Sequence, residues 1–148
     1  MSDVAFSRDG MMVATGGDDR VLRLWSSAAG RLLRTFTGFE YPVGRVFFHP
    51  DGKTLVVGEV DFLGDRKGKT SLWDLAIGRR FKMIDGQRLL TLSPDGRTLA
   101  TGSLDNTVRL LDCVTLQERA AARGHTEVIS AGAFSPDGRL LATACLGS

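Results

Sequence analysis

The sequence predicts an all-β protein in which short antiparallel strands form repeated four-stranded units. Three observations carry this prediction. One segment recurs four times at nearly constant spacing, the apolar runs are only four to seven residues long, and turn-forming residues bound every run. The chain has 148 residues, of which 43% are hydrophobic, as expected for one globular domain.

The recurring segment marks the first strand of each unit and the turn that follows it. Each copy ends in Asp-Gly, and the copies align without gaps at residues 4–10, 46–52, 90–96 and 132–138. Their aspartates are separated by 42, 44 and 42 residues. Proline presets φ for a tight turn, aspartate bonds the local backbone, and glycine accepts the left-handed conformation. Each copy therefore predicts a strand that runs into a hairpin turn.

A second apolar run follows each of these turns. These runs lie at residues 12–16, 55–58, 99–102 and 141–144. Third runs lie at residues 21–25, 70–74 and 107–111, and fourth runs at residues 31–36, 79–84 and 116–119. The runs lack helical periodicity, and Val, Leu, Thr and Phe are frequent in them, so each predicts a strand.

The charge of the runs predicts their order within a unit. The first three runs are nearly continuous in apolar or small residues, as expected for strands covered on both faces. The fourth runs are more charged, which protects an outer edge strand from pairing with other chains. Four-stranded units of about 40–45 residues are propeller blades. The predicted fold is an open arc of about three and a half blades, with units at about 1–41, 42–86 and 87–127 and a half unit at 128–148.

Several phrases repeat in phase with these units. They are the Pro-Asp-Gly turns, Ala-Thr-Gly-Ser at 100–103, Asp-Asn-Thr-Val-Arg-Leu at 105–110, Trp73-Asp74 and Gly124-His125. With these motifs the chain resembles the WD-repeat (WD40) β-propeller family over essentially its whole length. The resemblance implies a scaffold that binds other proteins and has no catalytic activity.

The resemblance also implies a polar network of His, Ser or Thr, Asp and Trp inside each blade, and no unit carries the full set. Phe39 stands at the His position of the second unit, and Leu111 replaces Trp in the third. Gly147 falls where the fourth unit would carry Asp. Blade rigidity is therefore expected to depend mainly on apolar packing.

The sequence offers no constellation for catalysis. We interpret His49 as a turn residue and His125 as the donor or acceptor of a structural hydrogen bond, because neither has a Cys or His at metal-ligand spacing. The serines of the turns recur at equivalent positions, as turn formers do. No nucleophile elbow or phosphate-binding loop occurs. We therefore expect no catalytic residues, no cofactor and no metal.

Charge and cysteine content restrict the partners and the compartment. Nineteen basic and seventeen acidic residues give a net charge of +2, which is too balanced to indicate a nucleic acid or an anionic membrane as partner. The N-terminus has no basic region followed by an apolar stretch, so no secretory signal is expected. Cys113 and Cys145 are too few for a disulfide scaffold and predict free thiols in a reducing, cytoplasmic location.

The second unit departs from the repeat by an insertion. Asp51 and Trp73 are 22 residues apart, whereas the equivalent Asp9 and Trp25 are 16 apart. The extra residues fall in the loop 59–69, on the same rim as the loops that precede each first strand. The resemblance implies that this rim binds partners, and aromatic residues and arginine are enriched at interfaces. The candidate partner-binding residues are Phe39, Tyr41, Phe62, Arg66, Lys67, Arg88 and His125.

An arc of this length leaves two blade faces uncovered, because closed propellers have four to eight blades. The chain is therefore expected to be part of a longer propeller, to associate with copies of itself, or to be an open fragment. The alternative functions are a ligand-binding or enzymatic propeller whose site lies on other blades, and a self-assembling structural unit. The apolar residues expected on the uncovered faces are Val4, Phe6, Val13, Val21 and Leu24 at one end, and Ala133, Phe134, Leu140 and Leu141 at the other.

Overall fold

The computed structural model describes residues 3–61 and 67–146, which form fourteen strands and, within these ranges, no helix. Blade 1 contains β1 (Asp3–Phe6), β2 (Met12–Gly16), β3 (Leu22–Ser26) and β4 (Leu32–Phe36). Blade 2 contains β5 (Val43–Phe48), β6 (Thr54–Val60), β7 (Gly68–Asp74) and β8 (Arg79–Asp85). Blade 3 contains β9 (Gln87–Leu92), β10 (Thr98–Ser103), β11 (Val108–Asp112) and β12 (Glu118–Ala122). The half-blade contains β13 (Ile129–Phe134) and β14 (Leu141–Cys145).

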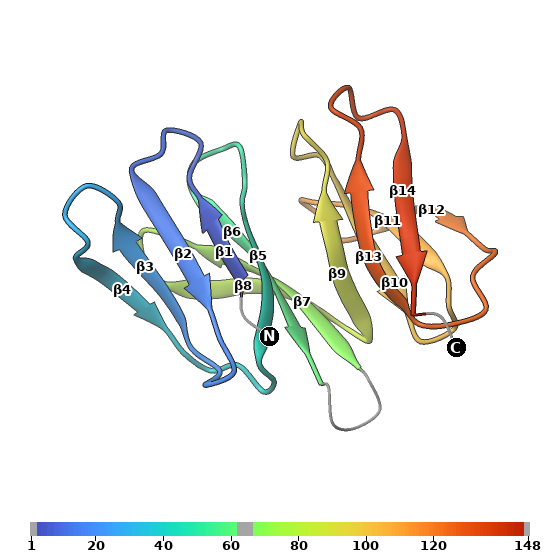
Figure 1. Cartoon of the computed structure of the whole chain (residues 1–148), viewed down its shortest axis with the longest axis horizontal. Helices are drawn as coiled ribbons and strands as arrows, with labels where there is room; N and C mark the ends of the chain where they lie inside the picture. Colours follow the sequence, from blue (N-terminus) through green and yellow to red (C-terminus); the bar gives the residue numbers. More distant parts are fainter. Residues whose placement is uncertain (1–2, 62–66, 147–148) are drawn as a thin grey trace.

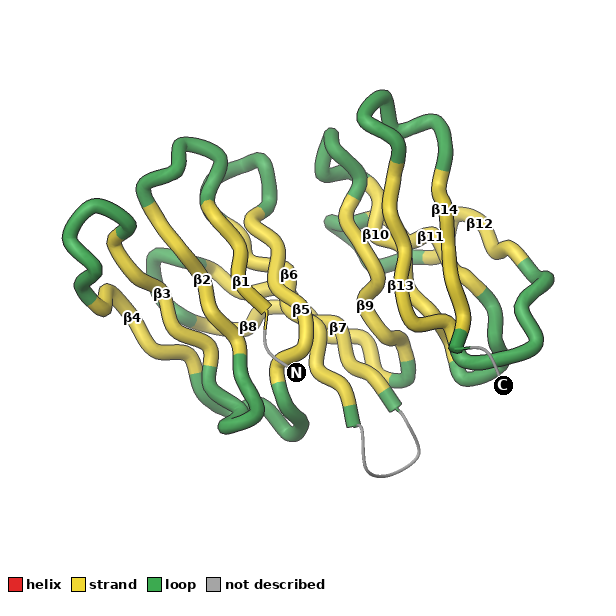
Figure 2. Tube along the Cα trace, viewed as in Figure 1, coloured by secondary structure: helices red, strands yellow, loops and turns green. Residues whose placement is uncertain are grey.

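Every sheet is an antiparallel meander, with strand orders β1-β2-β3-β4, β5-β6-β7-β8, β9-β10-β11-β12 and β13-β14. Figure 1 shows the sheets following one another along the chain, and Figure 2 shows that turns and loops alone connect them. The first strands are neighbours, since β1 contacts β5, β5 contacts β9, and β9 contacts β13. The predicted all-β fold, an arc of three four-stranded blades and an incomplete fourth, is confirmed.

The charged fourth strands are the outer edges, as their composition predicts. Residues of β12 are exposed throughout, and those of β8 are mostly exposed. The second strands β6 and β10 are almost entirely buried instead. No helix in the described residues is long and apolar enough to cross a membrane.

One set of turns repeats the same hydrogen-bonding pattern at the end of each first strand. In the first unit the Ser7 hydroxyl donates to Asp9 Oδ1 at 2.7 Å, and the Met11 N–H donates to the same oxygen at 2.9 Å. Ser93 with Asp95 and Ser135 with Asp137 repeat this arrangement. These hydroxyls lower the pKa of the aspartates that they contact. The sequence-predicted turn role of these residues is confirmed.

His49 replaces serine in the second of these turns and also joins two blades. Its Nδ1 accepts the Asp51 N–H at 3.1 Å, and its Nε2 lies 2.8 Å from the Gly96 carbonyl oxygen in the next blade. Both contacts are satisfied by one neutral tautomer with the proton on Nε2. His49 is thus a turn residue, as the sequence predicts, and in addition an inter-blade contact.

Neighbouring blades pack the apolar side chains of their facing sheets against each other. Val46, Leu55 and Trp73 of blade 2 share one buried cluster with Ala14, Leu22, Leu24 and Phe36 of blade 1. Gly16 lies at this contact, where an added Cβ would be 2.4 Å from Val43 Cγ1. Leu24 therefore faces blade 2, and its sequence-based placement on the uncovered face is wrong.

In the half-blade, two residues that were expected on the uncovered face also lie on the covered one. Phe134 and Leu141 pack against the buried cluster of Leu90, Ala100, Val108 and Ile129, so they face blade 3. Both strands of the half-blade are apolar on their two faces, and the sequence pattern does not distinguish which face is covered. Val4, Phe6 and Leu140 are exposed, as expected.

Two aspartates in blade 3 are expected to make the folded state less stable at acid pH. Hydrogen bonds from the Thr107 hydroxyl and backbone lower the pKa of Asp105 to about 2, and the backbone N–H groups of Thr115 and Val114 lower that of Asp112 to about 2. A carboxyl group whose pKa is depressed in the folded state stabilises that state at pH values above its unfolded pKa near 4. This stabilisation is lost as the pH falls through the folded pKa. We expect the urea concentration at the unfolding midpoint to decrease as the pH is lowered from 4 to about 2. The Asp112→Asn variant should show a shallower decline, and an unchanged slope would contradict this assignment.

Candidate partner-binding rim

The loops on one side of the blades form a rim, called here the loop rim. It contains the connections β2–β3, β4–β5, β8–β9, β10–β11 and β12–β13, which lie along the lower side of the molecule in Figure 2. The Ser-Asp turns described above lie on the opposite side, called here the turn rim. Those sequence-predicted partner-binding residues that the structure describes belong to loop-rim connections or to the strand ends beside them: Phe39, Tyr41, Lys67, Arg88 and His125.

A buried carboxylate fixes the β4–β5 loop. Glu59 of β6 is 0% exposed, and its Oε2 accepts the backbone N–H groups of Glu40 at 2.8 Å and Tyr41 at 3.1 Å. The Val60 N–H also donates to the Pro42 carbonyl oxygen at 3.1 Å. These three hydrogen bonds tie the backbone of the β4–β5 loop to β6.

The fixed loop presents an aromatic ring beside two charged groups. The ammonium of Lys69 forms an ion pair with Glu40 and lies 5.7 Å from the centre of the Tyr41 ring. The pair lowers the pKa of Glu40 and raises that of Lys69, and the neighbouring Glu40 carboxylate raises the pKa of Tyr41. Lys67 lies just before β7, two residues before Lys69, and it is exposed. Tyr41, Glu40, Lys67 and Lys69 are called here the Tyr41 patch.

Phe39 is a core residue and offers little surface to a partner. It is only 7% exposed, and its ring centre is 4.9 Å from that of Trp73. Phe39 stands where the family often has His, and it fills the space over the buried Trp73 ring. The surface proposed below therefore leaves Phe39 out. Phe62 and Arg66 lie outside the described residues.

Arg88 and His125 lie on other parts of the loop rim. Arg88, near the start of β9, is half-buried, and Gly68 packs so closely on it that an added Cβ would be 2.6 Å from the Arg88 Cα. His125 is half-buried, and its Nε2 lies 2.7 Å from the Thr143 hydroxyl of β14. The structural hydrogen bond expected for His125 is thus present.

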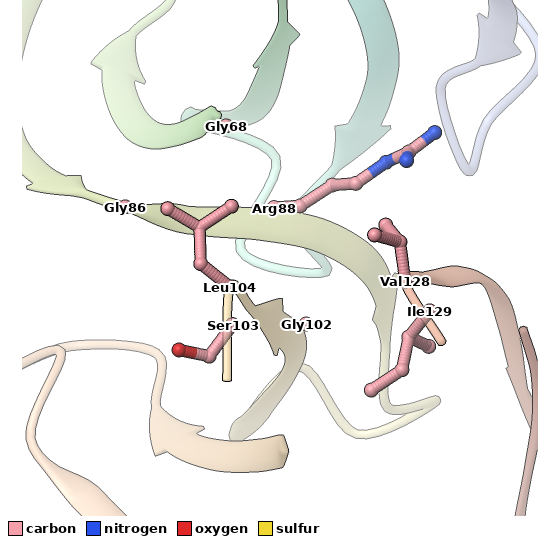
Figure 3. A pocket seen from close by; sticks show the side chains of 8 residues that line it. All are labelled: Gly68, Gly86, Arg88, Gly102, Ser103, Leu104, Val128 and Ile129. Carbon is pink, nitrogen blue, oxygen red and sulfur yellow. The ribbon is translucent and has the colours of Figure 1, made fainter. Parts of the chain in front are cut away.

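A small hollow lies where blades 2 and 3 meet the half-blade. Figure 3 shows the side chains of Arg88, Ser103, Leu104, Val128 and Ile129 around it, and three glycines complete its lining: Gly68, Gly86 and Gly102. It has room for about one water molecule. Sites for small-molecule ligands are far larger, about 300–1,000 Å³. This hollow therefore does not provide a substrate pocket.

The incomplete polar networks of the blades are partly replaced by other pairs. The Trp25 indole N–H donates to the Thr15 hydroxyl at 2.9 Å, and the Trp73 indole N–H donates to the Ser71 hydroxyl at 2.9 Å. In blade 3 the Thr101 hydroxyl donates to the Gln87 side-chain oxygen at 2.8 Å. Sequence analysis missed Gln87 and Glu59. The signal for Glu59 was present, since it is the only charged residue within the apolar run 55–60.

The described residues hold no group of three His, Cys, Asp or Glu side chains placed to bind a metal ion. Both cysteines are free, and burial raises the pKa of Cys113 to about 11. Because the thiolate is the reactive form, this thiol is chemically inert near neutral pH.

Comparison with known proteins agrees with the resemblance that the sequence motifs indicate. The family model described as "WD domain, G-beta repeat" matches residues 1–26, 30–74, 85–112 and 117–148. Periodic tryptophan protein 2 homolog of Dictyostelium discoideum is 31% identical over 97% of this chain, and an uncharacterised WD repeat-containing protein of Synechocystis is 34% identical over 97%. WD repeat-containing protein 3 of Homo sapiens is 27% identical over 97% of the chain. The chain spans only 16%, 41% and 16% of these three relatives, respectively.

Proposed function

Because the chain belongs to the WD40 family of β-propeller proteins, we propose that it is a non-catalytic scaffold that binds other proteins through the Tyr41 patch. The observation that carries the proposal is the fixed, half-exposed Tyr41 ring beside Lys69. Tyrosine and arginine dominate binding energy at protein interfaces, and a pre-ordered loop loses little entropy on association. The non-catalytic character rests on the family and is part of the proposal.

Charge and thiol chemistry support the same proposal. Lys69 is paired with Glu40, so the patch is mixed in charge and does not form the continuous basic stripe that nucleic-acid binding needs. The free thiols of Cys113 and Cys145 are consistent with the proposed cytoplasmic location. The partners proposed are therefore proteins, and neither a nucleic acid nor a membrane surface.

The test is quantitative affinity capture from the source cell with wild-type chain and the Tyr41→Ala variant. Loss of a central aromatic anchor costs about 2 kcal/mol or more, so the affinity for the specific partners should fall more than about tenfold. Met11→Ala is the matched control, because Met11 is an exposed apolar residue on the turn rim. Its capture profile should equal that of the wild type. Equal capture by wild type and Tyr41→Ala would refute the Tyr41 patch as the binding surface.

A further inference from the structure

The sequence contains five Asp-Gly pairs, and the structure holds one of them differently from the other four. The pairs lie at residues 9–10, 51–52, 85–86, 95–96 and 137–138. Four of them close the turns after the first strands, on the turn rim, and are called here the turn pairs. The fifth, Asp85-Gly86, joins β8 to β9. Because glycine has no side chain to hinder attack by its nitrogen, Asp-Gly is the aspartyl pair that rearranges most easily.

In the turn pairs the glycine nitrogen is bonded to another partner. The Gly96 N–H donates to the Ser93 carbonyl oxygen at 2.9 Å. The other three glycines make the equivalent bond at 2.8–3.1 Å: Gly10 to Ser7, Gly52 to His49 and Gly138 to Ser135. Each of these nitrogens must leave its partner before it can attack the aspartate side chain.

The carboxylates of the turn pairs are bonded to other donors as well. Asp95 Oδ1 accepts the Arg97 N–H at 3.0 Å and the Ser93 hydroxyl at 2.6 Å. The other three carboxylates accept the N–H two residues further on in the same way: Asp9 that of Met11, Asp51 that of Lys53, and Asp137 that of Arg139. The serine hydroxyls lower the pKa of Asp9, Asp95 and Asp137. This depletes the neutral carboxyl group from which the rearrangement starts.

Asp85 and Gly86 bind each other instead. The Gly86 N–H donates to Asp85 Oδ1 at 2.9 Å, so the nitrogen and the carboxyl group that would react are already in contact. Asp85 is exposed, and no atom from beyond the chain neighbours of Gly86 lies within 4 Å of the place where its Cβ would be. Water therefore has access to the pair. Asp3 makes the same contact with the Val4 N–H at 3.0 Å, but the branched side chain of valine hinders the attack.

We propose that Asp85-Gly86 is a site of spontaneous aspartate isomerisation in the folded protein, and that the turn pairs are protected from it. The Gly86 nitrogen forms a bond to Asp85 Cγ, and one carboxyl oxygen leaves as water with the amide proton and a proton from solvent. The product is a five-membered cyclic imide.

Hydrolysis of the imide gives two products. Water adds at the main-chain carbonyl carbon of Asp85, the bond from that carbon to the nitrogen breaks, and the chain continues through Cγ as isoaspartate. The nitrogen regains a proton, and the new carboxylate releases one to solvent. Addition of water at Cγ returns aspartate instead. Neither route changes the mass of the chain.

The site lies in the shortest connection between two blades. Gly86 alone separates the end of β8 from the start of β9, whereas residues 37–42 separate β4 from β5. Isoaspartate adds one carbon to the main chain in this link. Beside it, blades 2 and 3 are in close contact, since a Cβ on Gly68 would lie 2.6 Å from Arg88 Cα. Gly86 also lines the small hollow at this junction (Figure 3).

The test is to store the purified, folded chain for several weeks near neutral pH and to measure isoaspartate at all five pairs. Electron-transfer fragmentation of the proteolytic peptides distinguishes isoaspartate from aspartate at equal mass. Isoaspartate at residue 85 is expected to exceed that at each turn pair by about tenfold or more, because a turn pair must first break two hydrogen bonds. The same chain stored in urea is the control, since all five pairs lose their native contacts there, and they should convert at similar rates.

Asp85→Glu is the matched variant, because glutamate would have to form a six-membered ring and rearranges far more slowly. It should abolish the signal at residue 85 and leave the turn pairs unchanged, and circular dichroism verifies that it is folded. The measurement needs no binding partner, so its outcome is independent of the proposed function. Absence of isoaspartate at residue 85, equal accumulation at all five pairs of the folded chain, or an equal excess at residue 85 in urea would overturn the proposal.

Discussion

Phe36→Ala is expected to lower the free energy of unfolding by about 3–5 kcal/mol. Phe36 is 1% exposed at the end of β4, and its ring meets Trp73 of blade 2 edge-on, with 5.8 Å between ring centres. Truncation removes buried apolar area and an aromatic pair and leaves a cavity between blades 1 and 2. Because a domain is stable by only about 5–15 kcal/mol, the loss should be visible in a urea unfolding curve.

Phe81→Ala is the control for this change, since Phe81 is an exposed phenylalanine on the outer strand β8. Its effect should be within about 0.5 kcal/mol, as for most surface substitutions. Equal losses for Phe36→Ala and Phe81→Ala would mean that the packing of blade 1 on blade 2 does not stabilise the chain.

Gly16→Ala is expected to destabilise the fold by about 1–3 kcal/mol, although alanine is otherwise more favourable than glycine in a strand. An added Cβ would lie 2.4 Å from Val43 Cγ1 and 3.1 Å from the Val43 carbonyl oxygen, so the two blades must separate to admit it. The measurement is a double-mutant cycle with Val43→Ala, which removes the nearest of these atoms. The loss caused by Gly16→Ala should be smaller in the Val43→Ala background, and strictly additive losses would contradict the close contact.

The strands and turns could be predicted because local chemistry determines them. Asp137 and Gly138 close their hairpin by a hydroxyl contact from Ser135 and a φ of 73° at the glycine, and both requirements can be read from the sequence. The charged composition of β12 likewise predicted an exposed edge.

The covered faces could not be predicted in the same way. Inner strands are apolar on both sides, so the sequence pattern did not show that Leu24 faces blade 2 or that Leu141 faces blade 3. The pairing of β9 with β10 also shifts register between Ala100 and Thr101, and such a bulge changes which residues share a face.

Of the candidate site, the sequence indicates the loops but not how each residue in them is placed. The insertion lies between β6 and β7, and aromatic composition selects both Tyr41 and Phe39. The two side chains lie in different places because of partners distant in sequence. Glu59 binds the backbone of Tyr41 at the rim, whereas Phe39 packs on Trp73 in the core. Neither partner is adjacent in sequence.

The central claim is that each blade of this chain is stabilised by the neighbouring blade that packs on its face. Urea unfolding of Phe36→Ala, of Trp73→Ala and of the double variant tests it most directly, because these two rings meet between blades 1 and 2. The loss of unfolding free energy in the double variant is predicted to be smaller than the sum of the two single losses. Strictly additive losses would contradict the claim.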